Sequence, residues 1–190
     1  MKLKTWLAIV ALALLGSAGV RATPIVYSGT LALGLPVTGS TTGFSYFLDE
    51  GANVNFWRVF LTAGEVIGIS ATRLNQNLNP AFDFYSGITS ADTSAFVDGT
   101  SWGGMTLLAS LMDNVPAPSP GTGPGGDPLL SRFIVPSTGV YTVAVGGFLS
   151  SDDGSYPYRL EAAIVPTPGT VPLLLVGLLG LIFTRRQFRH

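Results

Sequence analysis

The chain has 190 residues, 47% of them hydrophobic, with no cysteine and a single histidine, His190. The lack of cysteine excludes disulfides, thiolate metal sites and a cysteine nucleophile. The formal net charge is −1, but residues 23–164 hold eleven acids, four arginines and no lysine, so this segment carries a charge of −7. A segment of that charge repels the phosphates of nucleic acids, and no nucleic-acid partner is expected.

Residues 1–22 have the pattern of a secretory signal peptide. Lys2 and Lys4 form a basic start, residues 6–15 are apolar but too few to span a bilayer comfortably, and small residues surround Ala22. This is the order that a signal peptidase reads. We expect cleavage after Ala22 and export of the remaining chain. An uncleaved N-terminal membrane anchor is the alternative.

Residues 23–164 alternate between apolar and polar positions in short runs that are separated by turn-forming residues, which is typical of β-strands. The sequence shows no convincing amphipathic helix between these runs. The predicted fold class is all-β: an antiparallel β-sandwich or jelly roll of about eight to nine strands, forming one domain over residues 23–164. The expected strands are residues 25–33, 42–47, 54–61, 66–72, 81–85, 129–135, 140–145 and 156–164, with either a strand or a helical turn at 105–111.

The clearest pair of strands, 54–61 and 66–72, is separated by the short segment Thr-Ala-Gly-Glu. Two β-branched and aromatic runs around a glycine-containing turn predict a β-hairpin. Two longer segments, 86–104 and 115–128, are rich in turn-forming residues and are expected to be irregular loops. The apolar alternate positions are expected to lie in the core: Phe56, Val59 or Phe60, Leu61, Ile67, Ile69, Phe133, Val135, Tyr141, Val143 and Val145.

Three of these segments carry a recognisable motif. Residues 62–65 contain an Ala-Gly turn, residues 80–85 read Pro-Ala-Phe-Asp-Phe-Tyr, and residues 136–143 read Pro-Ser-Thr-Gly-Val-Tyr-Thr-Val. With these motifs, the segment 55–163 resembles the bacterial pre-peptidase C-terminal domain family. The resemblance implies a β-sandwich of the kind appended to secreted enzymes, in which some members bind calcium or polysaccharide.

Catalytic options are narrow, because residues 23–164 contain neither histidine nor lysine. That excludes a Ser-His-Asp triad, a Ser-Lys pair and a histidine-liganded zinc or copper site within them. Carboxylates remain, and the candidate calcium ligands are Asp83, Asp127, Asp152 and Asp153, in or beside predicted loops. Calcium prefers such oxygen ligands. The simpler interpretation is that these acids are solvated or form turns, and a glycosidase with two paired carboxylates is the enzymatic alternative.

Aromatic residues offer a second kind of candidate site. A carbohydrate-binding module needs a strip of exposed aromatic side chains, and four residues of this sequence are to be examined for it: Trp57, Tyr85, Trp102 and Tyr158. Trp102 lies in a Gly/Ser-rich loop and is therefore expected to be exposed. Trp102 and Tyr158 are the candidate ligand-contacting residues, and simple packing in the core is the competing interpretation.

Residues 165–190 combine a Pro-Thr-Pro hinge, the apolar segment 171–184 and an Arg-Arg pair. The uninterrupted apolar run of about 13 residues would form a helix of roughly 20 Å, whereas a bilayer core is about 30 Å thick. The apolar run is therefore predicted to form a short transmembrane helix. The arginines that follow it are expected on the cytoplasmic side of the membrane, which arginines prefer. The expected sandwich is thus flanked by a signal helix and a transmembrane helix.

This tripartite tail resembles a PEP-CTERM sorting signal, with threonine in place of the family's central glutamate. The resemblance implies that the tail pauses in the inner membrane, where an exosortase-type enzyme removes it and the remaining chain is delivered outward, often in bacteria that make exopolysaccharide. A plain single-span anchor is the alternative. The sorting-motif residues are Pro166, Thr167, Pro168, Arg185 and Arg186.

Together these features predict an exported, non-enzymatic protein of the cell surface or extracellular matrix, with a structural or adhesive role in exopolysaccharide or biofilm. The expected partners are signal peptidase, the exosortase-type enzyme, the inner membrane in transit and extracellular polysaccharide. No cofactor is expected apart from calcium as a candidate. A carbohydrate- or calcium-binding module is the alternative function.

Overall fold

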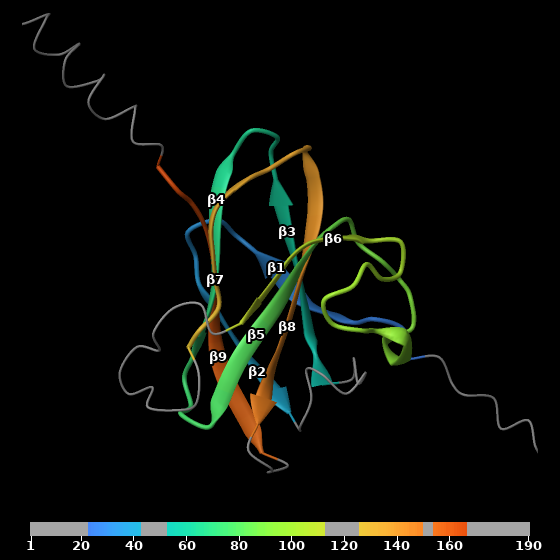
Figure 1. Cartoon of the computed structure of the whole chain (residues 1–190), viewed down its shortest axis with the longest axis vertical. Coiled ribbons are helices and arrows are strands. Elements are labelled where there is room, and N and C mark those ends of the chain that lie inside the picture. The colour runs from blue at the N-terminus through green and yellow to red at the C-terminus, as the bar shows by residue number, and fades with distance from the viewer. Residues whose placement is uncertain (1–22, 43–52, 113–125, 150–153, 167–190) are drawn as a thin grey trace, which may run out of the picture.

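The computed structural model describes residues 23–42, 53–112, 126–149 and 154–166, which form a two-layered β-sandwich (Figure 1). The predicted all-β class and the predicted eight to nine strands are confirmed for these residues. The elements are β1 (Tyr27–Leu31), β2 (Val37–Thr42), β3 (Asn55–Leu61), β4 (Val66–Arg73), β5 (Leu78–Ser86), the short 3₁₀ helix η2 (Thr93–Ala95), β6 (Thr106–Met112), β7 (Leu129–Ile134), β8 (Gly139–Leu149) and β9 (Ser155–Ile164).

The strands divide into a five-stranded sheet, in the order β1-β3-β8-β5-β6, and a four-stranded sheet, in the order β2-β9-β4-β7. Among the described strands one pair departs from the predicted antiparallel arrangement: β1 runs parallel to β3, with Tyr27 opposite Phe56 and Leu31 opposite Val59. The reason lies in the connection. After β1 the chain passes through β2 in the other sheet before it reaches β3, so β3 enters the five-stranded sheet from the same end as β1.

The predicted hairpin of β3 and β4 is wrong. β3 pairs with β1 and β8 in one sheet, whereas β4 pairs with β7 and β9 in the other, so residues 62–65 carry the chain from sheet to sheet. Leu61 at the end of β3 and Ile67 at the start of β4 are both fully buried. A crossing between sheets lets these apolar faces oppose each other across the core. The same alternation fits a hairpin or a crossing, so the pattern alone does not distinguish them.

A second crossing, between β7 and β8, lies at the same end of the sandwich (Figure 1). The two crossings are bonded together, because the Gly64 N–H donates to the Val135 carbonyl at 2.9 Å and the Val135 N–H donates to the Glu65 carbonyl at 2.9 Å. The Tyr141 hydroxyl closes the second crossing by donating to the Ser137 carbonyl at 2.6 Å, in the manner of the tyrosine corners of β-sandwiches. Hydrogen bonds thus connect the two crossings at this end of the sandwich, which contains no disulfides.

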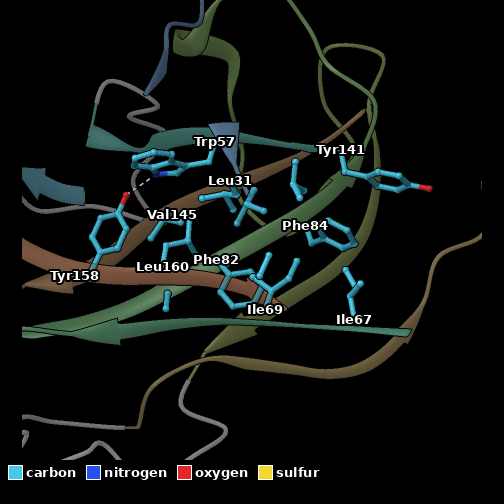
Figure 2. Close-up of a cluster of buried hydrophobic side chains, with 14 of the residues drawn as sticks. Leu31, Trp57, Ile67, Ile69, Phe82, Phe84, Tyr141, Val145, Tyr158 and Leu160 are labelled. Atoms are coloured by element: carbon cyan, nitrogen blue, oxygen red, sulfur yellow. Dashed lines mark hydrogen bonds between the residues drawn. The ribbon is translucent and has the colours of Figure 1, made fainter. Parts of the chain in front are cut away.

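The main core lies between the sheets and is filled by inward-facing side chains of both (Figure 2). Phe84 stacks on Tyr141 with ring centroids 5.5 Å apart, and Phe133 meets Phe84 edge-on at 5.3 Å. Burial of each large apolar side chain contributes about 1.5–3 kcal/mol, and this is the principal stabilisation of the fold. The question left open between Val59 and Phe60 is settled: Val59 is fully buried and Phe60 is 57% exposed.

Strand boundaries differ from the prediction most clearly at β2. β2 lies upstream of the strand expected at 42–47, whose residues 43–47 fall outside the described residues. Its sequence, Val-Thr-Gly-Ser-Thr-Thr, has little apolar alternation, so it gave no signal of a strand. The ambiguous segment 105–111 is the strand β6. The segment 86–104 is irregular apart from η2, as expected, and most of 115–128 falls outside the described residues.

The predicted signal helix at 1–22 and the predicted transmembrane helix at 171–184 both lie outside the described residues. Within the described ranges, no helix is long and apolar enough to cross a bilayer. The segment before β1 enters beside η2, whereas β9 ends on the opposite side of the sandwich (Figure 1). The two ends of the described domain therefore leave it in different directions.

Candidate functional site

The centre of the candidate site is β5, which is buried on both faces. Phe82 and Phe84 point into the main core, so Asp83 and Tyr85 point to the outer face of the five-stranded sheet, because successive strand residues alternate. Both outer residues are nevertheless fully buried. Residues 87–105, here called the covering loop, pack over this face beside β8 and β6 (Figure 1).

Asp83 is an acid with one satisfied and one unsatisfied oxygen. Its Oδ2 accepts a hydrogen bond from the Tyr85 hydroxyl at 2.8 Å and another from the Gly99 N–H of the covering loop at 2.7 Å. Its Oδ1 is buried and has no hydrogen-bond partner in the described structure. An unsatisfied buried oxygen costs about 1–3 kcal/mol or more. Of the two predicted calcium ligands that the structure describes, Asp83 is therefore the one with an oxygen left for a water or a cation.

Tyr85 acts as a permanent hydrogen-bond donor in this site. Burial raises the pKa of Tyr85 well above its ordinary value, and the Asp83 charge, the hydrogen bond to Asp83 and the Asp98 charge act in the same direction. The hydroxyl therefore keeps its proton throughout the physiological pH range. Asp98, from the covering loop, brings a second acid to the neighbourhood of Asp83 and Tyr85.

The covering loop is held on the sheet by aromatic contacts, which form a second core. Phe56 of β3 stacks on Trp102 with ring centroids 5.7 Å apart, and Phe96 meets these two rings edge-on at 5.4 and 5.3 Å. Trp102 is only 7% exposed, so the prediction that Trp102 is exposed is wrong. Its Gly- and Ser-rich neighbourhood indicated a solvated loop, but the outward-facing apolar side chains of the sheet provide a surface that the tryptophan covers.

Tyr158, the second candidate ligand-contacting residue, is fully buried as well. It lies on β9 in the main core, where its hydroxyl accepts a hydrogen bond from Trp57 Nε1 at 2.8 Å (Figure 2). Burial raises the pKa of Tyr158, and the hydrogen bond from Trp57 acts in the opposite direction. With Tyr85 and Trp102 also buried, all four aromatic residues considered for a carbohydrate-binding strip lie inside the molecule, which corrects that prediction.

Asp127 is part of a buried ion pair with Arg73. Arg73 Nε donates to Asp127 Oδ1 at 2.6 Å, the Arg73 backbone N–H donates to Asp127 Oδ2 at 3.3 Å, and the two side chains are 1% and 3% exposed. Arg73 Nη2 also donates to the Gly126 carbonyl at 2.5 Å and to Asn79 Oδ1 at 3.2 Å. Both oxygens of Asp127 are thus engaged by Arg73. A calcium ion on Asp127 would leave the guanidinium buried without its counter-charge.

The acids predicted as calcium ligands do not meet in one described site. Asp83 lies under the covering loop on the five-stranded sheet, Asp127 lies beside β4 of the other sheet, and Asp152 and Asp153 lie outside the described residues. The described ranges contain no group of three or more His, Cys, Asp or Glu residues that could hold a metal ion. Of the sorting and cleavage residues, Pro166 is exposed after β9, and the others lie outside the described residues: Ala22, Thr167, Pro168, Arg185 and Arg186.

One polar contact of the covering loop was missed by the sequence reasoning. Asp92 Oδ1 accepts hydrogen bonds from the Ser94 N–H at 3.0 Å and the Thr23 N–H at 2.9 Å. The hydrogen bond from Ser94, followed by that from Thr23, lowers the pKa of Asp92. The Asp-Thr-Ser sequence at 92–94 is a capping pattern, and this signal could have identified Asp92 as an acceptor of backbone N–H groups.

No protein-family model and no curated protein matches the chain. Solved structures do match it. The chain is similar to CorA, described as a surface-associated copper-binding protein important in Methylomicrobium album BG8 copper acquisition, with a TM-score of 0.51 and 15% identity over 73% of this chain and 98% of CorA. At this identity the similarity shows the fold alone.

Two further structures are similar at lower TM-scores. One is the pre-peptidase C-terminal domain of the Bacillus anthracis collagenase, with a TM-score of 0.43 and 13% identity over 74% of this chain and 99% of that domain. The other is the copper-binding secreted protein MopE of Methylococcus capsulatus, with a TM-score of 0.44 and 10% identity over 76% of this chain and 90% of that chain. A pre-peptidase C-terminal domain is thus a structural neighbour. The sorting signal, of which all but the first residues lie outside the described residues, stays a prediction.

The buried ion pair makes the first testable prediction. Asp127→Asn should lower the free energy of unfolding by about 3–5 kcal/mol, because it keeps the side-chain size but leaves Arg73 buried without a counter-charge. Chemical denaturation of the purified protein measures this loss. Glu161→Gln is the matched control: it removes one acid from the exposed Arg159–Glu161 pair and should cost less than about 1 kcal/mol. Equal losses for the two variants would contradict the assigned role of Asp127.

Proposed function

We propose that the chain is an exported, non-enzymatic β-sandwich protein of the cell surface or extracellular matrix, sorted through its C-terminal tail and structural or adhesive within extracellular polysaccharide. One observation carries the proposal: three of the side chains that the sequence offered for ligand chemistry are used inside the fold. Asp127 neutralises Arg73, and Trp102 and Tyr158 pack in the two cores. Such internal use favours a stable structural body over a binding cleft.

The outer face of the four-stranded sheet is the surface best suited to adhesion. Thr38 of β2, Arg159 of β9 and Thr72 of β4 stand opposite one another in a row across three strands. Thr38 and Arg159 are exposed, and Thr72 is half-buried between buried strand neighbours, so it points outward. We call these three residues the polar row. Hydroxyls and a guanidinium in a row on one sheet face can hydrogen-bond the neutral groups of a polysaccharide.

Charge and sequence order support an extracellular setting. A body with eleven acids and no lysine would approach acidic polysaccharide only through neutral groups or bridging cations, because like charges repel. The predicted signal peptide and the tail resembling a PEP-CTERM signal supply the route outward. CorA, which shares the fold, is described as surface-associated, and the proposal takes this setting from the comparison.

Copper binding is not carried over from CorA. The described residues contain no cluster of acids and histidines suited to a metal ion, and the one histidine of the chain, His190, lies outside them. Copper in proteins commonly takes imidazole or sulfur ligands. The proposed function therefore includes no copper site.

The sorting part of the proposal is tested by the intact mass of the protein from its native host, measured in membrane and medium fractions. We expect a mass that lacks residues 1–22 and the tail beyond about Pro168. Replacing Arg185 and Arg186 by alanine should leave the chain unprocessed, because these two residues belong to the sorting motif that the exosortase-type enzyme would read. Thr167→Glu, which restores the family's motif, should be processed at least as completely as the natural chain. Natural protein that keeps residues 171–190 in the membrane would end the sorting proposal.

The adhesive part is tested by co-sedimentation of the protein with polysaccharide isolated from the same host. Thr38→Val together with Thr72→Val should reduce the bound fraction several-fold, because the hydroxyls are lost while shape and strand preference are kept. Thr30→Val with Thr106→Val, exposed threonines of the five-stranded sheet, is the matched control and should bind like the natural protein. Unchanged binding by both pairs would remove the polar row from the proposal.

Calcium binding is a second candidate, favoured by the unsatisfied Asp83 Oδ1. A calcium ion there would need further oxygen ligands from backbone carbonyls or hydroxyls, which calcium accepts. Calcium in excess should then raise the Tm of the natural protein, since a ligand that binds the folded state stabilises it. Asp83→Asn should abolish this rise, while Glu161→Gln should keep it. A natural protein whose Tm is the same in calcium and in chelator rules this candidate out.

A further inference from the structure

Thr23 is fastened to the covering loop through both of its backbone polar groups. Its N–H donates to Asp92 Oδ1 at 2.9 Å, and its carbonyl accepts from the Thr93 N–H at 2.9 Å and from Thr93 Oγ1 at 3.0 Å. Two residues later, the Ile25 N–H donates to the Ala91 carbonyl at 3.1 Å. The start of the described chain is therefore aligned along the loop by four hydrogen bonds.

We propose that the mature protein begins at Thr23 and that its α-ammonium group forms an ion pair with Asp92, which fastens the covering loop to the sandwich. Thr23 directly follows the predicted cleavage site at Ala22, so the inference rests on the export route of the proposed function. It is independent of the C-terminal tail and of any ligand.

Cleavage places a positive charge on the Thr23 nitrogen, which already contacts Asp92 Oδ1. Hydrolysis adds one water across the Ala22–Thr23 peptide bond: the Ala22 carbonyl carbon takes the hydroxyl group and becomes a carboxylic acid, and the Thr23 nitrogen takes the hydrogen and becomes an amine. At neutral pH the acid then releases its proton and the amine takes one up. An α-amine has an ordinary pKa of about 7.7–8.0 and is mostly protonated at neutral pH. The nitrogen that donates to Asp92 would then donate as a cation, in a charge-assisted bond roughly twice as strong as a neutral one.

Asp92 is suited to receive this cation. The N–H groups of Ser94 and Thr23 lower its pKa, so it is ionised at any pH near neutrality. Among the described residues it is the charged side chain in contact with Thr23. The ion pair needs no new geometry, because the same nitrogen and oxygen already stand 2.9 Å apart.

The Thr23–Asp92 ion pair would hold the covering loop in place, and this loop also contacts Asp83. Ile25 and Ala91 pack against the second core, in which Trp102 is buried, and Gly99 of the same loop donates to Asp83. A loop released from Thr23 would expose Trp102 and admit water to Asp83. Signal-peptide cleavage would thus complete the closure of the covering loop after export.

The experiment compares two chains that end at His190 and begin either at Thr23 or at Ala22, each with its Asp92→Asn variant. The asparagine keeps an oxygen for the Ser94 cap but removes the charge. Isotope-labelled dimethylation of the α-amine and NMR titration give its pKa. We expect Asp92→Asn to lower the pKa of the Thr23 amine by about half a unit, and to have less than half of that effect in the chain that begins at Ala22. Glu161→Gln is the control for loss of an acid elsewhere.

Two further readouts test the ion pair and the loop. A raised amine pKa means that the pair stabilises the fold below the ordinary amine pKa and that this stabilisation is lost as pH rises through the folded-state value. The Tm difference between the Thr23 chain and its Asp92→Asn variant should therefore be larger near pH 6–7 than above about pH 9–10, where only the contribution of the Ser94 hydrogen bond remains. Acrylamide quenching of tryptophan fluorescence should increase in Asp92→Asn, because Trp102 becomes accessible.

The proposal is overturned by either of two results. One is a native protein whose N-terminal peptide, identified by mass spectrometry, begins at a residue other than Thr23. The other is an amine pKa that Asp92→Asn changes equally in both chains. Neither result bears on tail processing, so a failure of this inference is distinct from a failure of the sorting proposal.

Discussion

The burial of β5 on both faces is the constraint on which much of the structure depends. An antiparallel sandwich commonly leaves the outer face of a sheet to water. Here Phe82 fills the main core while Tyr85, on the opposite face, is covered by residues 87–105. Once that face is removed from water, Asp83 must find partners within the protein, and Tyr85 and Gly99 supply them for one of its two oxygens. The second core and the contacts of Thr23 with the loop follow from the same requirement.

The described part of the molecule handles its buried charge in two different ways. Arg73 and Asp127 neutralise each other, and Gly126 and Asn79 accept hydrogen bonds from Arg73 Nη2. Asp83 receives hydrogen bonds but no cation, and one oxygen stays without a partner. A compensated buried pair resists the loss of either member, whereas an unsatisfied buried oxygen favours the binding of a water or a cation. The two acids looked equivalent in the sequence, and their burial and neighbours give them different roles.

Local pattern predicted the strands well, since apolar alternation depends on neighbours two residues apart. It failed where the outcome depended on a distant partner. The alternation of β3 and β4 fits a hairpin, yet each strand joins a different sheet. The Gly- and Ser-rich surroundings of Trp102 fit a solvated loop, yet Phe56 and Phe96 bury it. β2 escaped notice because its small polar residues pair with β9, more than a hundred positions away, and contribute little apolar alternation.

The sequence by itself determined the all-β class, the approximate number of strands, the acidic and lysine-free character of residues 23–164, and the exclusion of thiol and histidine chemistry from them. These properties follow from composition and short-range periodicity. Only the tertiary structure decided which side chains meet: Arg73 with Asp127 across 54 positions, and Thr23 with Asp92 across 69. The reason is that such contacts form only when the two sheets and the covering loop pack against one another. The strand preference of a segment indicates a half-buried surface, but it does not determine which other segment packs on that surface.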